Sequence, residues 1–82
     1  MDYKIVEVIW EDALFNNDQV SPDDACKTVP FMRNNVGYCL SQEGGKIILG
    51  FGFVLGEHKD QMWVDGTLCI PSSMVKEVRI LK

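Results

Sequence analysis

Acid–base chemistry in this sequence would have to start from His58, the one histidine among its 82 residues. Glu57 and Asp60 lie close enough along the chain to orient its ring, as a general base requires. The segment is polar and typical of a loop, so an exposed histidine is the better interpretation. A metal site would need a second histidine or acids at a metal-loop spacing, and the sequence has neither. We therefore expect no metal and no cofactor.

Two other patterns could carry catalysis. Ser72 and Ser73 are adjacent hydroxyls, but they follow a proline and are better interpreted as turn residues. Glu11 and Asp12 are adjacent carboxylates, yet neighbours on a strand point to opposite faces and form a poor acid–base pair. Neither pattern indicates catalysis, and we expect that the protein is not an enzyme.

The three cysteines, Cys26, Cys39 and Cys69, are widely spaced and form no C-x-x-C motif. An odd number with this spacing favours neither a disulfide scaffold nor a zinc site. Secretion would leave three thiols open to mispairing. We therefore expect buried free thiols, with Cys39 and Cys69 on the face opposite the core, and a cytoplasmic location.

Binding is better supported than catalysis, because large aromatic and basic side chains are available. A nucleotide base could stack on a tryptophan or tyrosine while its phosphate binds an arginine or lysine. The alternative is that the arginines are simply solvated. The candidate ligand- or partner-binding residues are Trp63, Trp10, Tyr38, Arg33, Lys46, Lys59 and Arg79.

Charge is unevenly distributed along the chain. Residues 1–24 carry seven acids and one base, a net of −6, whereas residues 25–82 carry seven bases and five acids, a net of +2. An acidic protein without a cluster of lysines and arginines is a poor candidate for binding duplex nucleic acid. The acidic half is either a solvated face or a patch for a basic partner.

Hydrophobicity predicts a single domain over residues 1–82 with no membrane segment. The longest apolar run, residues 47–55, contains two glycines and is much shorter than the roughly 20 residues of a membrane helix. The polar N-terminus is not typical of a signal peptide.

Alternating β-branched and aromatic residues predict a mainly β fold. A long loop over residues 11–35 joins the first two strands and contains one short helical turn that begins at Ser21-Pro22. Gly44-Gly45 forms a hairpin turn, and a 3₁₀ turn precedes the last strand. This order favours a five-stranded SH3-like small barrel over an OB-like barrel, which would need a clearer helix. The expected strands are residues 3–10, 36–42, 46–54, 62–70 and 75–81.

The strands carry apolar residues on both faces, and a small barrel has only one core. The core-facing residues should be Trp10, Ile47, Leu49, Phe51, Phe53, Met62, Val64, Leu68 and Ile70. Val6 and Val8 share the face of Trp10, although both faces of the first strand are largely apolar. The opposite face includes Trp63 and the candidate oligomer residues Ile5, Ile9, Ile48, Val54 and Cys69. Because an exposed apolar face is a usual reason to associate, we expect a homo-oligomer, a dimer by default or a larger ring.

The segment from Ile70 to Val75 resembles the end of an SH3 domain, but the aromatic pair of a proline-binding groove is absent. Three segments resemble short uncharacterised proteins of bacteriophages and prophages: residues 10–13, residues 36–40, and Ile70-Pro71 with the strand that follows. This resemblance implies an accessory protein acting in the cytoplasm of a bacterial host cell. Such proteins commonly block host components or sequester nucleotide signals of immunity.

Three functions remain open at this point. The first is a non-enzymatic accessory protein that inhibits or modulates a host protein by direct interaction. The second is an oligomeric anti-defence protein that sequesters a small nucleotide signal. The third is a structural or assembly component.

Overall fold

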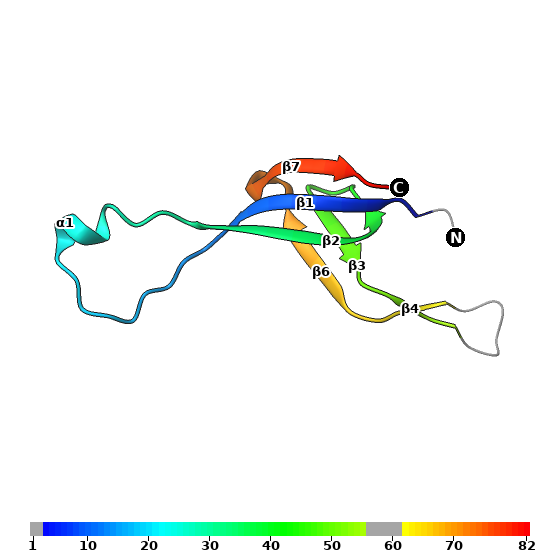
Figure 1. Cartoon of the computed structure of the whole chain (residues 1–82), viewed down its shortest axis with the longest axis horizontal. Helices are drawn as coiled ribbons and strands as arrows, with labels where there is room; N and C mark the ends of the chain where they lie inside the picture. The colour runs from blue at the N-terminus through cyan, green and yellow to red at the C-terminus, as the bar shows by residue number, and fades with distance from the viewer. Residues whose placement is uncertain (1–2, 56–61) are drawn as a thin grey trace.

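The computed structural model describes residues 3–55 and 62–82, and they form a mainly β fold with one turn of α-helix (Figure 1). This confirms that the fold is mainly β, as expected. The elements are β1 (Ile5–Asp12), α1 (Pro22–Ala25), β2 (Phe31–Ser41), β3 (Lys46–Gly50), β4 (Phe53–Val54), β5 (Trp63–Val64), β6 (Thr67–Pro71), the 3₁₀ turn η1 (Ser72–Met74) and β7 (Val75–Ile80).

Five strands form an antiparallel sheet in the order β6-β3-β2-β1-β7, and β4 pairs with β5 in a separate two-stranded hairpin. Gly44 and Gly45 make the turn from β2 to β3 with φ angles of 72° and 74°, which glycine adopts without steric cost. The predicted hairpin turn and the predicted 3₁₀ turn are both confirmed.

The helical turn begins where the sequence predicts. The Asp24 N–H donates to the Ser21 hydroxyl oxygen at 3.1 Å, and Pro22 occupies the first turn, where its missing N–H costs nothing. The helix ends after Ala25, and none of its residues is buried.

The core is small because six side chains from three strands make it: Val6, Val8, Trp10, Ile47, Leu49 and Ile70. Trp10, Ile47, Leu49 and Ile70 were predicted to face the core, and Val6 and Val8 were predicted to share the face of Trp10. Leu68, also predicted, packs against them half-buried, as do Val75 and Cys39. The side of the sheet that carries these residues is called the core side below, and the opposite side the outer side.

The second strand begins at Phe31, five residues earlier than predicted, so the connection from β1 covers residues 13–30 rather than 11–35. The sequence in this stretch is polar and shows no strand pattern. Its side chains are paired across to β1 instead: Asn34 donates to Glu7 and the Trp10 indole N–H donates to Asn35. Because these hydrogen bonds satisfy the polar side chains, the pairing of β1 with β2 continues as far as Asp12 and Phe31.

The predicted third strand is interrupted between β3 and β4, and the predicted fourth strand between β5 and β6. The two interruptions lie side by side. The Phe51 N–H donates to the Gly66 carbonyl and the Asp65 N–H donates to the Gly52 carbonyl, both at 2.9 Å, so the two chains bend together. The predicted core positions of Phe51 and Met62 are therefore wrong, since these side chains are 47% and 48% exposed.

Beyond the bend, the β4–β5 hairpin covers part of the outer side. The Phe53 ring stacks on Tyr3 with centroids 5.7 Å apart and meets Tyr38 edge-on at 4.9 Å. A Cβ built on Gly50 would lie 2.9 Å from a Val64 methyl group, so the hairpin packs closely against β3. Phe53 and Val64 are half-buried here, not in the predicted core.

The expectation of buried thiols is wrong for two of the three cysteines. Cys26 ends the exposed helical turn and Cys69 lies on β6 at the edge of the sheet, and both are exposed. Cys39 is half-buried and packs against the core, because it lies directly opposite Leu49 rather than on the outer side.

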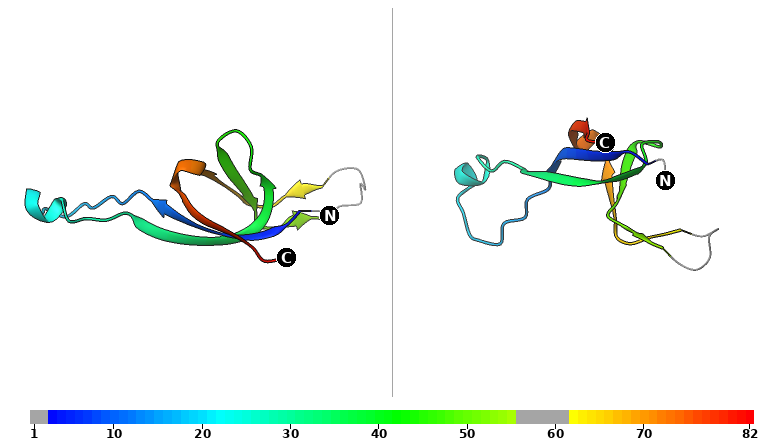
Figure 2. Two further views of the ribbon diagram at one scale, coloured as in Figure 1. Left: turned by 90° about the horizontal axis from the view of Figure 1, so that it is seen from above. Right: turned by 45° about the vertical axis from the view of Figure 1, so that its right-hand side comes forward.

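The molecule is long and narrow, measuring 58 × 23 × 22 Å with a radius of gyration of 16.9 Å. A compact domain of this length would have a radius of about 12 Å. Two projections account for the difference: residues 13–30 extend from one end and the β4–β5 hairpin from the other (Figures 1 and 2). No helix within the described residues is long and apolar enough to cross a membrane.

Candidate functional site

The structure does not bring the predicted binding residues together. Trp10 is buried in the core, whereas Trp63 is 66% exposed on the β4–β5 hairpin. Tyr38 is half-buried against Phe53. Arg33 lies near the start of β2, toward the end of the sheet away from Trp63 (Figure 1).

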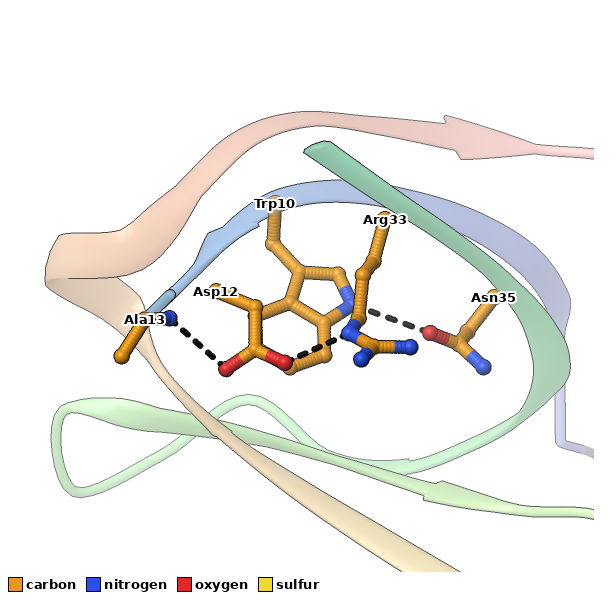
Figure 3. Close-up of polar contacts among 5 residues, drawn as sticks. All are labelled: Trp10, Asp12, Ala13, Arg33 and Asn35. Carbon is orange, nitrogen blue, oxygen red and sulfur yellow. Dashed lines mark hydrogen bonds and ion pairs between the residues drawn. The ribbon is translucent and has the colours of Figure 1, made fainter. Parts of the chain in front are cut away.

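Arg33 belongs to a polar network at the point where residues 13–30 leave the sheet (Figure 3). Its Nε donates to Asp12, and the other oxygen of that carboxylate accepts the Ala13 N–H at 2.9 Å. Next to it, the Trp10 indole N–H donates to the Asn35 side-chain oxygen at 3.0 Å. The network thus fixes the end of the β1–β2 ribbon.

The other predicted bases are also separate. Arg79 forms ion pairs with Glu7 and Glu77, each at 3.3 Å. Lys46 is exposed beside the β2–β3 turn, and Lys59 lies outside the described residues. Both arginines therefore already bind carboxylates. Among the described residues, no cluster of basic side chains surrounds Trp63.

The predicted oligomer face is divided in the same way. Ile48 lies directly opposite Cys69 where β3 pairs with β6, whereas Ile5 and Ile9 are on β1, with β2 between. Val54 belongs to the β4–β5 hairpin. The isoleucines are half-buried and the other two residues are exposed.

A shallow hollow lies where the chain leaves and re-enters the sheet. It has a volume of about 140 Å³ and is lined by Glu11, Asp12, Ala13, Pro30, Ser73 and Met74. A second hollow of about 210 Å³ is lined by Phe31, Met32 and Arg33. Both are smaller than the roughly 300–1,000 Å³ of a usual small-ligand pocket, and they suit a protein side chain better than a nucleotide.

Residues 13–30, called the acidic arm below, begin and end at this hollow, which Ala13 and Pro30 line. Every residue in the arm is exposed, including Phe15 at 85% and Val29 at 71%. Exposed apolar side chains on a segment outside the core are candidates for an interaction surface. The sequence contains these apolar residues, but they follow neither a helix nor a strand periodicity. It therefore did not predict where they would lie.

The arm is also acidic. It carries Asp18, Asp23 and Asp24 against one base, Lys27, and Glu11 and Asp12 lie at its root. The two root carboxylates are paired with Lys76 and Arg33, whereas no ion pair to the three arm aspartates occurs within the described part of the chain. Across residues 3–55 and 62–82, no group of three acids, cysteines or histidines could hold a metal ion.

Comparisons with protein-family models, with curated proteins and with solved structures find no match to this chain. The geometry of the acidic arm and the hollow at its root is therefore the basis for a functional assignment.

Proposed function

We propose that this chain is a non-enzymatic binding protein that docks on a basic, partly apolar surface of another protein. The exposure of Phe15 and Val29 on the acidic arm carries the proposal. Such side chains cost free energy in water, and a partner that covers them removes that cost. We propose further that the partner is a component of a bacterial host cell, which is what the resemblance suggested from the sequence would imply.

The charge of the arm supports a basic partner. Asp18, Asp23 and Asp24 give the arm an excess of negative charge, which speeds encounter with a positive surface and repels a second acidic arm. An apolar side chain of the partner would enter the hollow between Pro30 and Met74, with its basic neighbours facing the arm carboxylates.

The sheet is proposed to be an SH3-like barrel. The strand order β6-β3-β2-β1-β7 and the 3₁₀ turn between β6 and β7 support this assignment, since a short sheet reduces its exposed edges by curling on itself. In this arrangement the acidic arm joins the first two strands of the barrel.

Synthetic peptides test the proposal. A panel of basic amphipathic peptides rich in lysine and leucine would be titrated into ¹⁵N-labelled protein, beside peptides in which glutamate replaces lysine. We expect shifts confined to residues 11–30 and to Ser73 and Met74, with an affinity that falls as salt is added. Equal binding of the glutamate peptides, or no shift with any basic peptide, would overturn the proposal.

A matched pair of variants locates the contact. Phe15→Ser should weaken peptide binding about tenfold or more, because an exposed aromatic anchor contributes over about 1.4 kcal/mol at such interfaces. Leu55→Ser changes a side chain that is 80% exposed on the β4–β5 hairpin and should leave binding unchanged. Equal loss in both variants would place the contact elsewhere.

A further inference from the structure

The first half of β2 has a free edge. β1 pairs with β2 from Phe31 to Tyr38, whereas the pairing of β2 with β3 begins only at Tyr38. Within the described part of the chain, residues 31–37 thus have a neighbouring strand on one side only. In the left view of Figure 2 this half of β2 runs along the margin of the molecule.

The bonds to β1 determine which backbone groups face this edge. The Cys39 N–H donates to the Lys4 carbonyl at 2.8 Å. Since the bonding direction alternates along an antiparallel strand, every second residue back from Cys39 also bonds toward β1. The N–H and C=O groups of Met32, Asn34 and Val36 consequently face outward, away from β1.

This edge lacks the features that usually prevent strands from pairing. Protective edges carry lysine, proline or a bulge, and residues 31–37 contain neither lysine nor proline and no bulge against β1. The one charged side chain, Arg33, is engaged by Asp12. Met32 and Val36 are 55% and 46% exposed, so the edge offers apolar side chains together with backbone donors and acceptors.

We propose that two copies of the chain pair through this edge, with their β2 strands antiparallel and centred on Asn34. In this register the outward-facing residues bond each other: Met32 meets Val36 of the partner subunit, and Asn34 meets Asn34 of the partner subunit. Two apolar pairs then flank a pair of amides on the outer side. Centring the pair on Arg33 would instead bring two arginines directly opposite each other, which is unfavourable.

The core side of the strand fits the same register. Arg33 lies opposite Asn35 of the partner subunit, so no like charges meet. The edge is therefore complementary to itself, and a second copy of this chain is the partner that it fits.

This pairing joins two five-stranded sheets into one. Because the two β2 strands are antiparallel, the acidic arms leave the dimer in opposite directions and both remain free for the proposed basic partner. The dimer does not use Ile5, Ile9, Ile48, Val54 or Cys69, so the face predicted from the sequence stays a separate prediction.

A proline variant tests the edge. Asn34→Pro removes an N–H that faces away from β1, which an edge strand tolerates, and places the proline ring where the second strand would bond. In sedimentation measurements up to about 1 mM, where even weak association of about −4 kcal/mol is detected, we expect a dimer for the wild type and a monomer for Asn34→Pro. Asn34→Ser, which keeps the N–H, should remain dimeric.

Disulfide trapping tests the register and does not depend on the fold of the proline variant. In a Cys26→Ser, Cys69→Ser background, oxidised Asn34→Cys should form a covalent dimer linked through position 34, since directly opposite Cα atoms lie about 5.5 Å apart. Arg33→Cys should not link to itself, because its partner position is displaced along the strand beyond about 7 Å.

Three results would overturn the proposal: a wild-type chain that stays monomeric, an Asn34→Pro variant that dimerises like the wild type, or faster linking through position 33. Added salt separates this proposal from arm binding. Association through backbone hydrogen bonds should change little with salt, whereas peptide binding to the acidic arm should weaken.

Discussion

Trp10 and Trp63 lie in very different environments. Trp10 is 8% exposed and its indole N–H binds Asn35, whereas Trp63 is mostly exposed. Trp10→Phe should lower the free energy of unfolding by about 2 kcal/mol, because it removes a part-buried hydrogen bond and leaves space in the core. Urea unfolding followed by far-UV circular dichroism measures the loss.

The matched change at the second tryptophan is the control. Trp63→Phe should alter stability by no more than about 0.5 kcal/mol, as expected for an exposed side chain away from the core. Acrylamide should quench Trp63 fluorescence strongly and Trp10 fluorescence weakly. Equal destabilisation by the two substitutions would contradict the burial described here.

At this scale the sequence predicted part of the core and none of the polar pairing. Val6, Val8 and Trp10 were predicted to share one face of the first strand, because every second residue of a strand points to the same side, and all three are buried in the core. The pairing of Arg33 with Asp12 joins residues 21 positions apart. Only the register of β1 against β2 brings them together, and no local pattern encodes that register.

Among the elements, the β4–β5 hairpin depends on one close approach to the sheet. A Cβ on Gly50 would lie 2.9 Å from the Val64 methyl group and 3.2 Å from Leu40, so Gly50→Ala must push the hairpin away from β3. We expect a loss of about 1–3 kcal/mol in the free energy of unfolding, the usual cost of overpacking. Chemical denaturation gives the magnitude.

Gly52→Ala provides the comparison within the same bend. The nearest atom to its added Cβ is 4.0 Å away, so the substitution should be neutral or slightly stabilising. The ¹⁵N spectrum of Gly50→Ala should also change at Phe53 and Tyr38. If Gly50→Ala were as stable as Gly52→Ala, the hairpin would not pack on the sheet in solution.

The existence of strands was predictable, whereas their interruptions were not. Residues 46–54 look like one continuous apolar strand, yet paired hydrogen bonds between Phe51 and Gly66 and between Asp65 and Gly52 bend both chains. Bending depends on where the two segments meet. Periodicity describes a segment alone and gives no information on its partner, so Phe51 was placed in the core wrongly.

On the scale of the whole molecule, the acidic arm and the sheet are structurally independent. No residue from 13 to 30 is buried, and the polar contacts within the arm are local: the Ser21 cap, the helical turn and the Asp18 N–H on Asn16. Hydrogen bonds from Arg33 to Asp12 and from Trp10 to Asn35 hold β1 and β2 together up to the point where the arm begins. The long shape therefore reflects a small folded unit with a separate projection.

Replacing residues 13–30 by Asn-Gly should then leave the fold intact. Asp12 and Phe31 are directly opposite, and a two-residue Asn-Gly turn is the favoured connection for such a pair. The free energy of unfolding should be unchanged or higher by up to about 2 kcal/mol, because a shorter loop costs less entropy to close. The variant should lose binding of basic peptides and retain dimerisation, since the edge of β2 is untouched.

A second variant with an 18-residue Gly-Ser segment in place of the arm separates the effect of loop length from the effect of the arm's side chains. It should also fold and dimerise, and it should fail to bind the basic peptides. An unfolded deletion variant would show that the arm stabilises the sheet, and binding by the Gly-Ser variant would remove the arm from the proposed interface.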